Sequence, residues 1–309
     1  MKQKVILTID IGGTNLKGAL VPLNTYGEFI DKKMVSTIPR YNELKIQLEN
    51  IIKYYINNLK KEYNISGIGV ATAGRVDHKE GKIIYATDNI KGLTGFNIRD
   101  YLQEKFDIPV IVDNDGNAAC WGEYKYKTEH QGENVHSMCL ITLGTGVGGG
   151  LVINEKLVRG NTWKGGEIGH MKIKEKGRKC TCGYKGCWEC YVGKKGILKT
   201  AKKFYDYEKI SDLSVKDIYN DSPKSKAAEK TINRTGYYLA IGIKNLIHIF
   251  DPEIIVLGGG ISRAGDKLIN SISTQLYDNK INKKQTKLEI AYLGNQAGQI
   301  GIKEMFCSN

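Results

Sequence analysis

The sequence predicts an α/β protein with two domains. Apolar runs typical of buried strands alternate with segments that carry apolar residues at helical spacing, and the alternation continues through both halves of the chain. A strand, a glycine-rich turn and a second strand open each half, at Lys4–Val21 and again at Met138–Asn154. The length of 309 residues fits two domains of ordinary size, each able to bury its own core.

The first half begins with a strand at Lys4–Ile9, the turn Asp10–Asn15 and a second strand at Leu16–Val21. Glu43–Tyr63 has apolar residues along one helical face, so it is predicted to be a helix. The other expected elements are a strand near Phe29–Ile38, a buried strand at Gly67–Ala73, a helix at Asn97–Phe106, a strand at Pro109–Val112 and a helix at Asp115–Tyr126.

The second half begins at His136. A strand at Met138–Leu143 leads into the turn Gly144–Gly150 and a strand starting at Leu151–Asn154. The remaining expected elements are helices at Gly193–Tyr205 and Ala227–Phe250, a strand at Ile254–Leu257, a helix at Asp266–Tyr277, a strand at Leu288–Leu293 and a terminal helix after Gln296.

Composition and charge exclude several classes of protein. Hydrophobic residues make up 41% of the chain and charged residues 26%, which is globular rather than disordered. No apolar run reaches the roughly 18 residues of a membrane span, and no signal-peptide pattern opens the chain, so we expect a cytoplasmic protein that does not bind a membrane. The net charge of +13 comes mainly from Lys spread along the chain. This spread favours a solvated surface over a nucleic-acid footprint, although a basic surface also attracts nucleotides.

Four of the seven cysteines crowd together, at Cys180, Cys182, Cys187 and Cys190. His170 precedes this cluster, and three thiolates with one imidazole match a tetrahedral zinc site. Cys190 is a fifth candidate ligand. The alternative is a set of free buried thiols, but such crowding in a cytosolic chain is more typical of a metal site.

Three glycine-rich loops each follow an apolar strand, at Asp10–Thr14, Gly144–Gly150 and Gly258–Gly260. Glycines let a backbone approach an anion closely and turn its N–H groups toward it. The Gly144–Gly150 loop is neither a Walker nor a Rossmann motif. One loop alone could be a hairpin turn, but three such loops favour a nucleotide held between two lobes.

Acids and amides crowd the junction of a strand and a helix at Asp113, Asn114, Asp115 and Asn117. Catalytic groups of α/β proteins gather at such carboxyl ends of strands. A carboxylate there can accept a proton from a substrate hydroxyl, and an amide can orient that hydroxyl. Helix capping is the alternative explanation, but one cap needs only one of these residues.

Taken together, these motifs resemble the ROK family of bacterial sugar kinases. The resemblance covers nearly the whole chain. It rests on DIGGT at Asp10–Thr14, NDGNAA at Asn114–Ala119, the stretch Leu140–Met171, CTCGYKGCWE at Cys180–Glu189 and LGGGIS at Leu257–Ser262. It implies the actin/hexokinase-like (ribonuclease H-like) fold, with two α/β lobes around a central cleft. The expected N-terminal lobe is 1–117, completed by the C-terminal helix 296–309, and the expected C-terminal lobe is 118–295.

The resemblance implies that ATP, Mg²⁺ and a structural Zn²⁺ are the cofactors. By this resemblance the ATP phosphates are faced by Gly12, Gly13, Thr14, Thr145 and Gly146, the adenosine is lined by Gly258, Gly259 and Gly260, and the magnesium lies near Asp10. The implied zinc ligands are His170, Cys180, Cys182 and Cys187.

The family pattern also implies the residues that act on the sugar. Asp115 matches the catalytic base. The implied sugar contacts are Gly74, Asn89, Asn114, Asp115, Glu167, His170 and Glu189. Three positions depart from common forms of the family, namely Phe96 where many glucose kinases carry Trp, Gly116 in place of Ala and Cys190 in place of a small residue.

The implied activity is ATP-dependent phosphorylation of the 6-hydroxyl of a hexose, with glucose as the lead substrate. N-acetylmannosamine, N-acetylglucosamine and β-glucosides are alternative substrates within the same family. A sugar-responsive repressor is the alternative from another class, and it is disfavoured because the first phosphate loop begins at Asp10, with no room expected for a preceding DNA-binding domain. A sugar-binding module without activity is a third possibility. The resemblance also suggests a homodimer.

Overall fold

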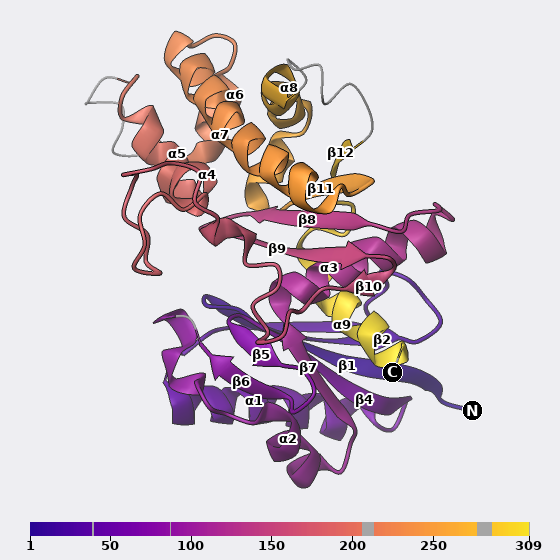
Figure 1. The fold of residues 1–309 in the computed structure, drawn as a ribbon. Helices are drawn as coiled ribbons and strands as arrows, with labels where there is room; N and C mark the ends of the chain where they lie inside the picture. The colour runs from indigo at the N-terminus through magenta and orange to yellow at the C-terminus, as the bar shows by residue number, and fades with distance from the viewer. Residues whose placement is uncertain (39, 87, 206–212, 277–285, 309) are drawn as a thin grey trace. The chain divides into compact units, whose positions relative to one another are not determined.

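The computed structural model describes residues 1–38, 40–86, 88–205, 213–276 and 286–308 (Figure 1). The chain divides into two compact units. Unit 1 consists of 1–134, 157–165 and 295–309, and unit 2 consists of 135–156 and 166–294. The C-terminal segment therefore belongs with the N-terminal part of the chain. The boundary expected after residue 117 falls inside helix α3 (Asp115–Lys125), which packs mainly against the C-terminal helix of unit 1 and stays whole within that unit.

Unit 1 contains a five-stranded mixed sheet. Its strands are β1 (Gln3–Ile11), β2 (Asn15–Pro22), β3 (Asp31–Ser36), β4 (Tyr63–Thr72) and β7 (Val110–Asn114). The order is β3-β2-β1-β4-β7, in which the first three strands in sequence form an antiparallel meander and β4 and β7 run parallel to β1. The predicted turn at Asp10–Asn15 is thus the connection of a β-hairpin.

Helices cover both faces of this sheet (Figure 1). One face packs on α1 (Tyr41–Leu59) and α2 (Ile98–Phe106), whose apolar sides bury residues such as Leu48 and Leu102 completely or almost completely. The other face packs on α3 and on α9 (Ala297–Cys307). A two-stranded sheet of β5 (Arg75–Asp77) and β6 (Lys82–Tyr85), the short helix η1 (Asp88–Leu93) and the π-helical turn η2 (Tyr126–His130) complete the regular elements described in this unit.

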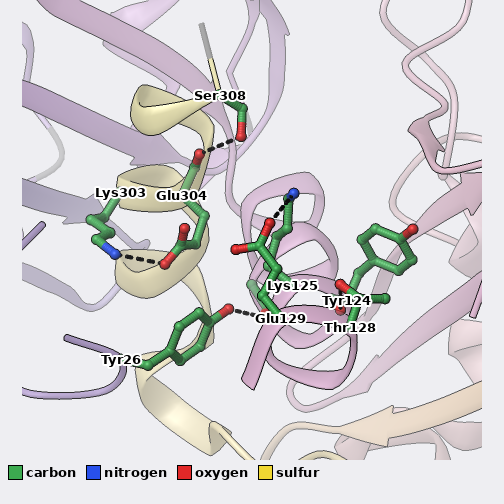
Figure 2. Close-up of polar contacts among 9 residues, drawn as sticks. Tyr26, Tyr124, Lys125, Thr128, Glu129, Lys303, Glu304 and Ser308 are labelled. Carbon is green, nitrogen blue, oxygen red and sulfur yellow. Dashed lines mark hydrogen bonds and ion pairs between the residues drawn. The ribbon is translucent and has the colours of Figure 1, made fainter. Parts of the chain in front are cut away.

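Helices α3 and α9 approach each other closely because glycines lie at their contact. A Cβ built on Gly301 would meet the carbonyl oxygen of Ala118 at 1.6 Å, and one built on Gly122 would meet that of Ala297 at 2.6 Å. Neither position leaves room for a side chain. Polar contacts frame the same region in Figure 2, where the hydroxyl of Tyr26 donates to the carbonyl of Gly122 at 2.8 Å. The C-terminal helix therefore determines where α3 lies on the sheet.

Unit 2 contains a second five-stranded sheet with the same kind of topology. Its strands are β8 (Met138–Leu143), β9 (Val147–Ile153), β10 (Lys156–Leu157), β11 (Ile254–Gly258) and β12 (Lys287–Ile290). The order is β10-β9-β8-β11-β12, with β8 and β9 antiparallel and β11 and β12 parallel to β8. The strand–glycine turn–strand units predicted in both halves are confirmed, and each forms the hairpin of its own sheet.

The helices of unit 2 are dominated by α7, a long helix whose apolar face buries residues such as Leu239 and Ile243. The described helices are α4 (Glu189–Val192), α5 (Lys194–Ala201), α6 (Val215–Asp221), α7 (Lys226–Phe250) and α8 (Asp266–Leu276), with short turns η3 (Ile168–His170) and η5 (Gly260–Ala264). The turn η7 (Gly294–Gln296) lies where the chain passes from unit 2 into unit 1. Tyr277, the expected last residue of α8, lies outside the described residues. Among the described helices, none has the length and apolar character needed to cross a membrane.

Candidate functional site

The predicted site residues of unit 1 gather at one edge of its sheet. The parallel strands β1, β4 and β7 end in register, since Ile11 pairs with Thr72 and Thr72 pairs with Asn114. The glycine loop after β1 and the acidic junction after β7 therefore emerge at the same edge. Two strand spacings separate them, about 10 Å. The carboxyl edge of parallel strands is where α/β proteins bind ligands.

The first glycine loop is a tight turn with exposed donors. The N–H of Gly12 donates to the carbonyl of Asn15 at 3.0 Å, and Thr37 holds the loop from outside by donating its hydroxyl to the carbonyl of Gly12 at 2.7 Å. Gly13 is partly buried, and Thr14 at the tip is exposed. The loop thus keeps a fixed shape while leaving a hydroxyl group accessible to a ligand.

Asp10, expected near a magnesium ion, is ion-paired in the structure. The Nζ of Lys17 lies 2.7 Å from Oδ2 of Asp10, and the two residues are direct partners across the β1–β2 hairpin. Both side chains are partly accessible, with exposures of 32% for Lys17 and 17% for Asp10, so a ligand can reach either group. Lys17 was not among the residues predicted from the sequence, although its place opposite Asp10 in the predicted hairpin could have indicated it.

Asn114, Asp115 and Gly74 lie together at the end of β7. The amide nitrogen of Asn114 donates to the carbonyl of Gly74 at 2.8 Å and to Oδ1 of Asp115 at 3.0 Å. The backbone N–H of Gly116 donates to the same oxygen of Asp115 at 2.9 Å, and Oδ1 of Asn114 caps α3 by accepting from the N–H of Asn117. Capping therefore does occur here, and the capping residue also orients the neighbouring carboxylate.

Gly74 has a backbone conformation that suits only glycine well. Its φ is +94°, and a Cβ at this position would meet the carbonyl oxygen of Tyr85 at 2.4 Å. The chain can therefore turn tightly between β4 and β5 and present its carbonyl to Asn114. Of the other expected sugar contacts in unit 1, Asn89 lies in η1, and the description does not extend to its side chain. Phe96 is buried against Tyr41 and Tyr101 and belongs to the core.

Asp113, the neighbouring acid, is buried and fully engaged. Its Oδ1 accepts from the backbone N–H of Asn114 at 2.7 Å and from the amide of Asn117 at 3.3 Å. Its Oδ2 lies 2.7 Å from both Nε and Nη2 of Arg159. Arg159 was not predicted from the sequence either, because 46 positions separate it from Asp113 and no local pattern connects the two residues.

Arg159 lies on the segment Leu157–Gly165, which returns from the strands of unit 2 to pack within unit 1. On the same segment, the ring of Trp163 packs edge-on against His78, with ring centroids 4.8 Å apart. Burial and the positive charge of Arg159 hold the pKa of His78 below its usual value. The segment is thus fastened to unit 1 at two points, one of which is the carboxylate beside the predicted base.

Unit 2 brings two of the three glycine loops together. β8 and β11 are parallel neighbours with Thr142 paired to Gly258, so their following loops leave the same edge of this sheet. Gly259, with φ of +84°, leaves a Cβ position only 2.4 Å from the carbonyl oxygen of Leu143, directly before the Gly144 loop. Thr145 and Gly260 at the two tips are exposed. Backbone of both loops is therefore available at one edge, as a nucleotide would need.

The predicted metal ligands form one cluster. Their ligand atoms all lie within 4.8 Å of one another, and the cluster consists of His170, Cys180, Cys182 and Cys187. The distance from Nδ1 of His170 to Sγ of Cys180 is 3.6 Å, and the distance between the sulfurs of Cys182 and Cys187 is also 3.6 Å. Zinc bonds of about 2.3 Å to sulfur and 2.0 Å to nitrogen in a tetrahedron require separations of about 3.8 Å and 3.6 Å. The residues therefore fit zinc.

Burial raises the pKa of the thiols of Cys180 and Cys187, so a metal would have to displace their protons when it binds. Cys190 lies outside the group of four and donates its thiol to the carbonyl of Lys179 at 3.6 Å. It neither replaces nor supplements a ligand in this geometry.

Glu189 connects the metal cluster to the second glycine loop. Its Oε2 accepts from the N–H of Val147 at 3.3 Å and lies 2.5 Å from the position of a Cβ on Gly146, while its Oε1 accepts from the thiol of Cys180 at 3.4 Å. Glu167 is exposed, and its carbonyl accepts from the N–H of His170 at 3.1 Å. Glu167, His170 and Glu189 thus lie around the metal knuckle, the segment Cys180–Cys187, and Glu189 also contacts the Gly144–Gly150 loop.

Comparison with known proteins identifies the family. The chain is 36% identical to a glucokinase of Halalkalibacterium halodurans, over 97% of this chain and 94% of the relative. It is 30% identical to a xylose repressor of Bacillus spizizenii, over 96% of this chain and 75% of the repressor. Its fold is similar to a ROK family glucokinase of Streptomyces griseus solved with glucose and AMPPNP, with a TM-score of 0.80, 26% identity and coverage of 97% and 98%. The ROK family profile matches residues 6–308, and this chain therefore belongs to the ROK family, with its hexokinase-like fold.

Proposed function

We propose that the protein is an ATP-dependent kinase that phosphorylates the 6-hydroxyl of a hexose, with glucose as the lead substrate. The observation that carries the proposal is the arrangement at the carboxyl edge of the unit 1 sheet. There the oriented carboxylate of Asp115 shares an edge with the Gly12–Thr14 loop and Asp10. A base and an anion-binding loop at one edge are the parts that phosphoryl transfer needs. The glucokinases among the relatives support the same activity.

In the proposed reaction, the carboxylate of Asp115 accepts the proton of the sugar hydroxyl as the hydroxyl oxygen attacks the γ-phosphorus of ATP. The bond between the γ-phosphorus and the β–γ bridging oxygen breaks, and ADP leaves. Asn114 donates to Oδ1 of Asp115, so the base keeps one orientation. The Gly12–Thr14 loop and Lys17 interact with the phosphates through N–H groups and positive charge. Mg²⁺, when bound, neutralises phosphate charge, and Asp10 is the residue proposed to hold it.

The proposed zinc has a structural role. Four protein ligands complete a tetrahedral shell, so none of its positions is open to a water molecule. His170 binds metal through Nδ1, and its other ring nitrogen can contact a sugar hydroxyl. We propose that Glu167, His170 and Glu189 contact the sugar. N-acetylmannosamine, N-acetylglucosamine and β-glucosides are alternative substrates, because the described contacts do not select among the groups at C1 and C2.

Replacement of Asp115 tests the proposal. Asp115→Asn keeps the size of the side chain and cannot accept the proton, so kcat should fall by about 10²–10⁴-fold while sugar affinity changes little. The assay follows ADP release with ATP and a panel of the sugars named above. Asp107→Asn, at an exposed helix end, is the matched control and should keep full activity. Near-normal kcat of Asp115→Asn with every sugar that the wild type uses would refute the assignment.

A further inference from the structure

The carboxylate of Asp113 is the centre of a chain of contacts that ends at the proposed base. It accepts from the N–H of Asn114 and the amide of Asn117 through Oδ1, and from Arg159 through Oδ2. Asn114 in turn donates to Oδ1 of Asp115. Arg159 is therefore connected to Asp115 through Asp113 and Asn114.

Burial makes this carboxylate sensitive to the loss of its partner. The side chain of Asp113 is 3% exposed, whereas that of Arg159 is 23% exposed. A buried carboxylate that loses its cation must move toward water, take up a proton or stay unpaired at high cost. Each response disturbs the acceptor that holds the first turn of α3. The backbone of Asp113 is also held in place, because Asp113 pairs with Ala71 one residue before the end of the ladder between β4 and β7.

The geometry of Arg159 suits this task better than that of a lysine. Two of its nitrogens lie 2.7 Å from one oxygen of Asp113, and Nη2 also lies 3.9 Å from the sulfur of Met305 on α9. The planar guanidinium thus contacts the strand end and the helix that supports α3 at the same time. A lysine in its place would supply the charge but only a single point of contact.

We propose that Arg159 is a positioning residue for phosphoryl transfer, which acts through Asp113 and Asn114 to hold the carboxylate of Asp115. The inference rests on the proposed function, in which Asp115 is the base. A displacement of about 1 Å in a catalytic group can cost 10²-fold in rate, so a small shift of the first turn of α3 is sufficient. The alternative is that Arg159 only fastens the segment Leu157–Gly165 to unit 1.

The test compares Arg159→Met, Arg159→Lys, Asp113→Asn and the double variant Asp113→Asn/Arg159→Met in the full-length protein. We expect Arg159→Met to lower kcat by about 10–100-fold while the KM for ATP changes less than threefold. Arg159→Lys should recover part of the loss. The double variant should be more active than Arg159→Met alone, because the uncompensated carboxylate is gone. Lys164→Met, at an exposed position of the same segment, is the matched control.

The outcomes separate this inference from the proposed function. Arg159→Met with kcat within twofold of the wild type and a lowered melting temperature would show that the residue only fastens the segment. A double variant no more active than Arg159→Met would also overturn the inference. If Arg159→Met does not fold, the kcat values of Arg159→Lys and of the double variant are compared with that of the wild type instead. A kcat within twofold of the wild type in Arg159→Lys and in the double variant would then overturn the inference. Asp115→Asn is measured in parallel. Full activity of Asp115→Asn would refute the assignment of Asp115 as the base. An inactive Asp115→Asn together with a normal kcat of Arg159→Met would refute only the positioning role of Arg159.

Discussion

Lys17 and Asp10 illustrate how a charge can be held ready for a ligand. The two side chains neutralise each other across the β1–β2 hairpin, and both keep partial access to solvent. The proposed binding of magnesium by Asp10 would free Lys17 to interact with a phosphate oxygen, so one ion pair is exchanged for two charge-assisted contacts. Neither the free protein nor the proposed complex would then hold a buried charge without a partner.

Replacement of Lys17 tests that role at the scale of one residue. Lys17→Met removes a charged donor, and hydrogen bonds to charged groups contribute about 1.5–3 kcal/mol, so the KM for ATP should rise about 10-fold or more. Steady-state kinetics with varied ATP at saturating sugar measure this. Lys4→Met, at the exposed start of β1 and at the far end of that strand from Asp10, is the control. A normal KM for ATP combined with a raised KM for sugar would contradict the role.

At the scale of elements, hydrogen bonds of Arg178 join the metal knuckle to helices α4 and α5, in addition to the contacts among the metal ligands. The guanidinium of Arg178 donates to the carbonyls of Cys190 and Gly196 at 2.8 Å and to the hydroxyl of Thr200 at 3.0 Å. Its backbone N–H donates to the hydroxyl of Tyr191 at 2.8 Å. These contacts tie the segment before the cysteines to α4 and α5, so loss of the metal should loosen the knuckle without unfolding unit 2.

Replacement of an exposed ligand tests the knuckle. Cys182→Ser should lose stoichiometric zinc and raise the sugar KM or abolish activity, because His170 and Glu189 are no longer held. Metal content by mass spectrometry and sugar kinetics are the measurements. Cys307→Ser, near the C-terminus, should keep both zinc and activity, and Cys190→Ser should keep zinc because it lies outside the ligand group. Stoichiometric zinc with normal kinetics in Cys182→Ser would count against the site.

At the scale of the whole molecule, the net charge of +13 bears on the choice between a kinase and a repressor. Xylose repressors are among the relatives, so a role as a transcriptional regulator has to be tested against the kinase. Lys side chains spread along the chain bind DNA through phosphates alone, and such binding weakens steeply with salt. A charge of this kind predicts weak attraction to any polyanion rather than recognition of one sequence.

A gel-shift assay with genomic fragments distinguishes the two classes. We expect retardation at low salt that does not depend on sequence and that disappears at physiological salt, with or without sugar. An unrelated fragment of equal length serves as the control. Sequence-specific retardation at physiological salt, released by a sugar, would favour a transcriptional regulator over the kinase.

Local patterns in the sequence determined much of this protein. Apolar runs and helical spacing predicted the principal strands and helices, and the spacing of His170 and the cysteines predicted the metal cluster, because these features depend on residues close together in the chain. Short elements such as α4, α6 and the β5–β6 hairpin were missed, since a few residues carry too little periodicity. Lys17 lay within reach of the same local reasoning, as the hairpin partner of Asp10.

Only the tertiary structure decided which distant residues act on the proposed base. The pairing of Arg159 with Asp113 and the glycine contact between α3 and α9 join segments far apart in sequence. The assignment of Leu157–Gly165 to unit 1 is likewise a matter of packing. Such contacts depend on how whole elements pack, and a buried carboxylate must be paired with whatever cation the fold brings to it. Sequence therefore indicated the chemistry of Asn114 and Asp115, while the fold determined what holds them.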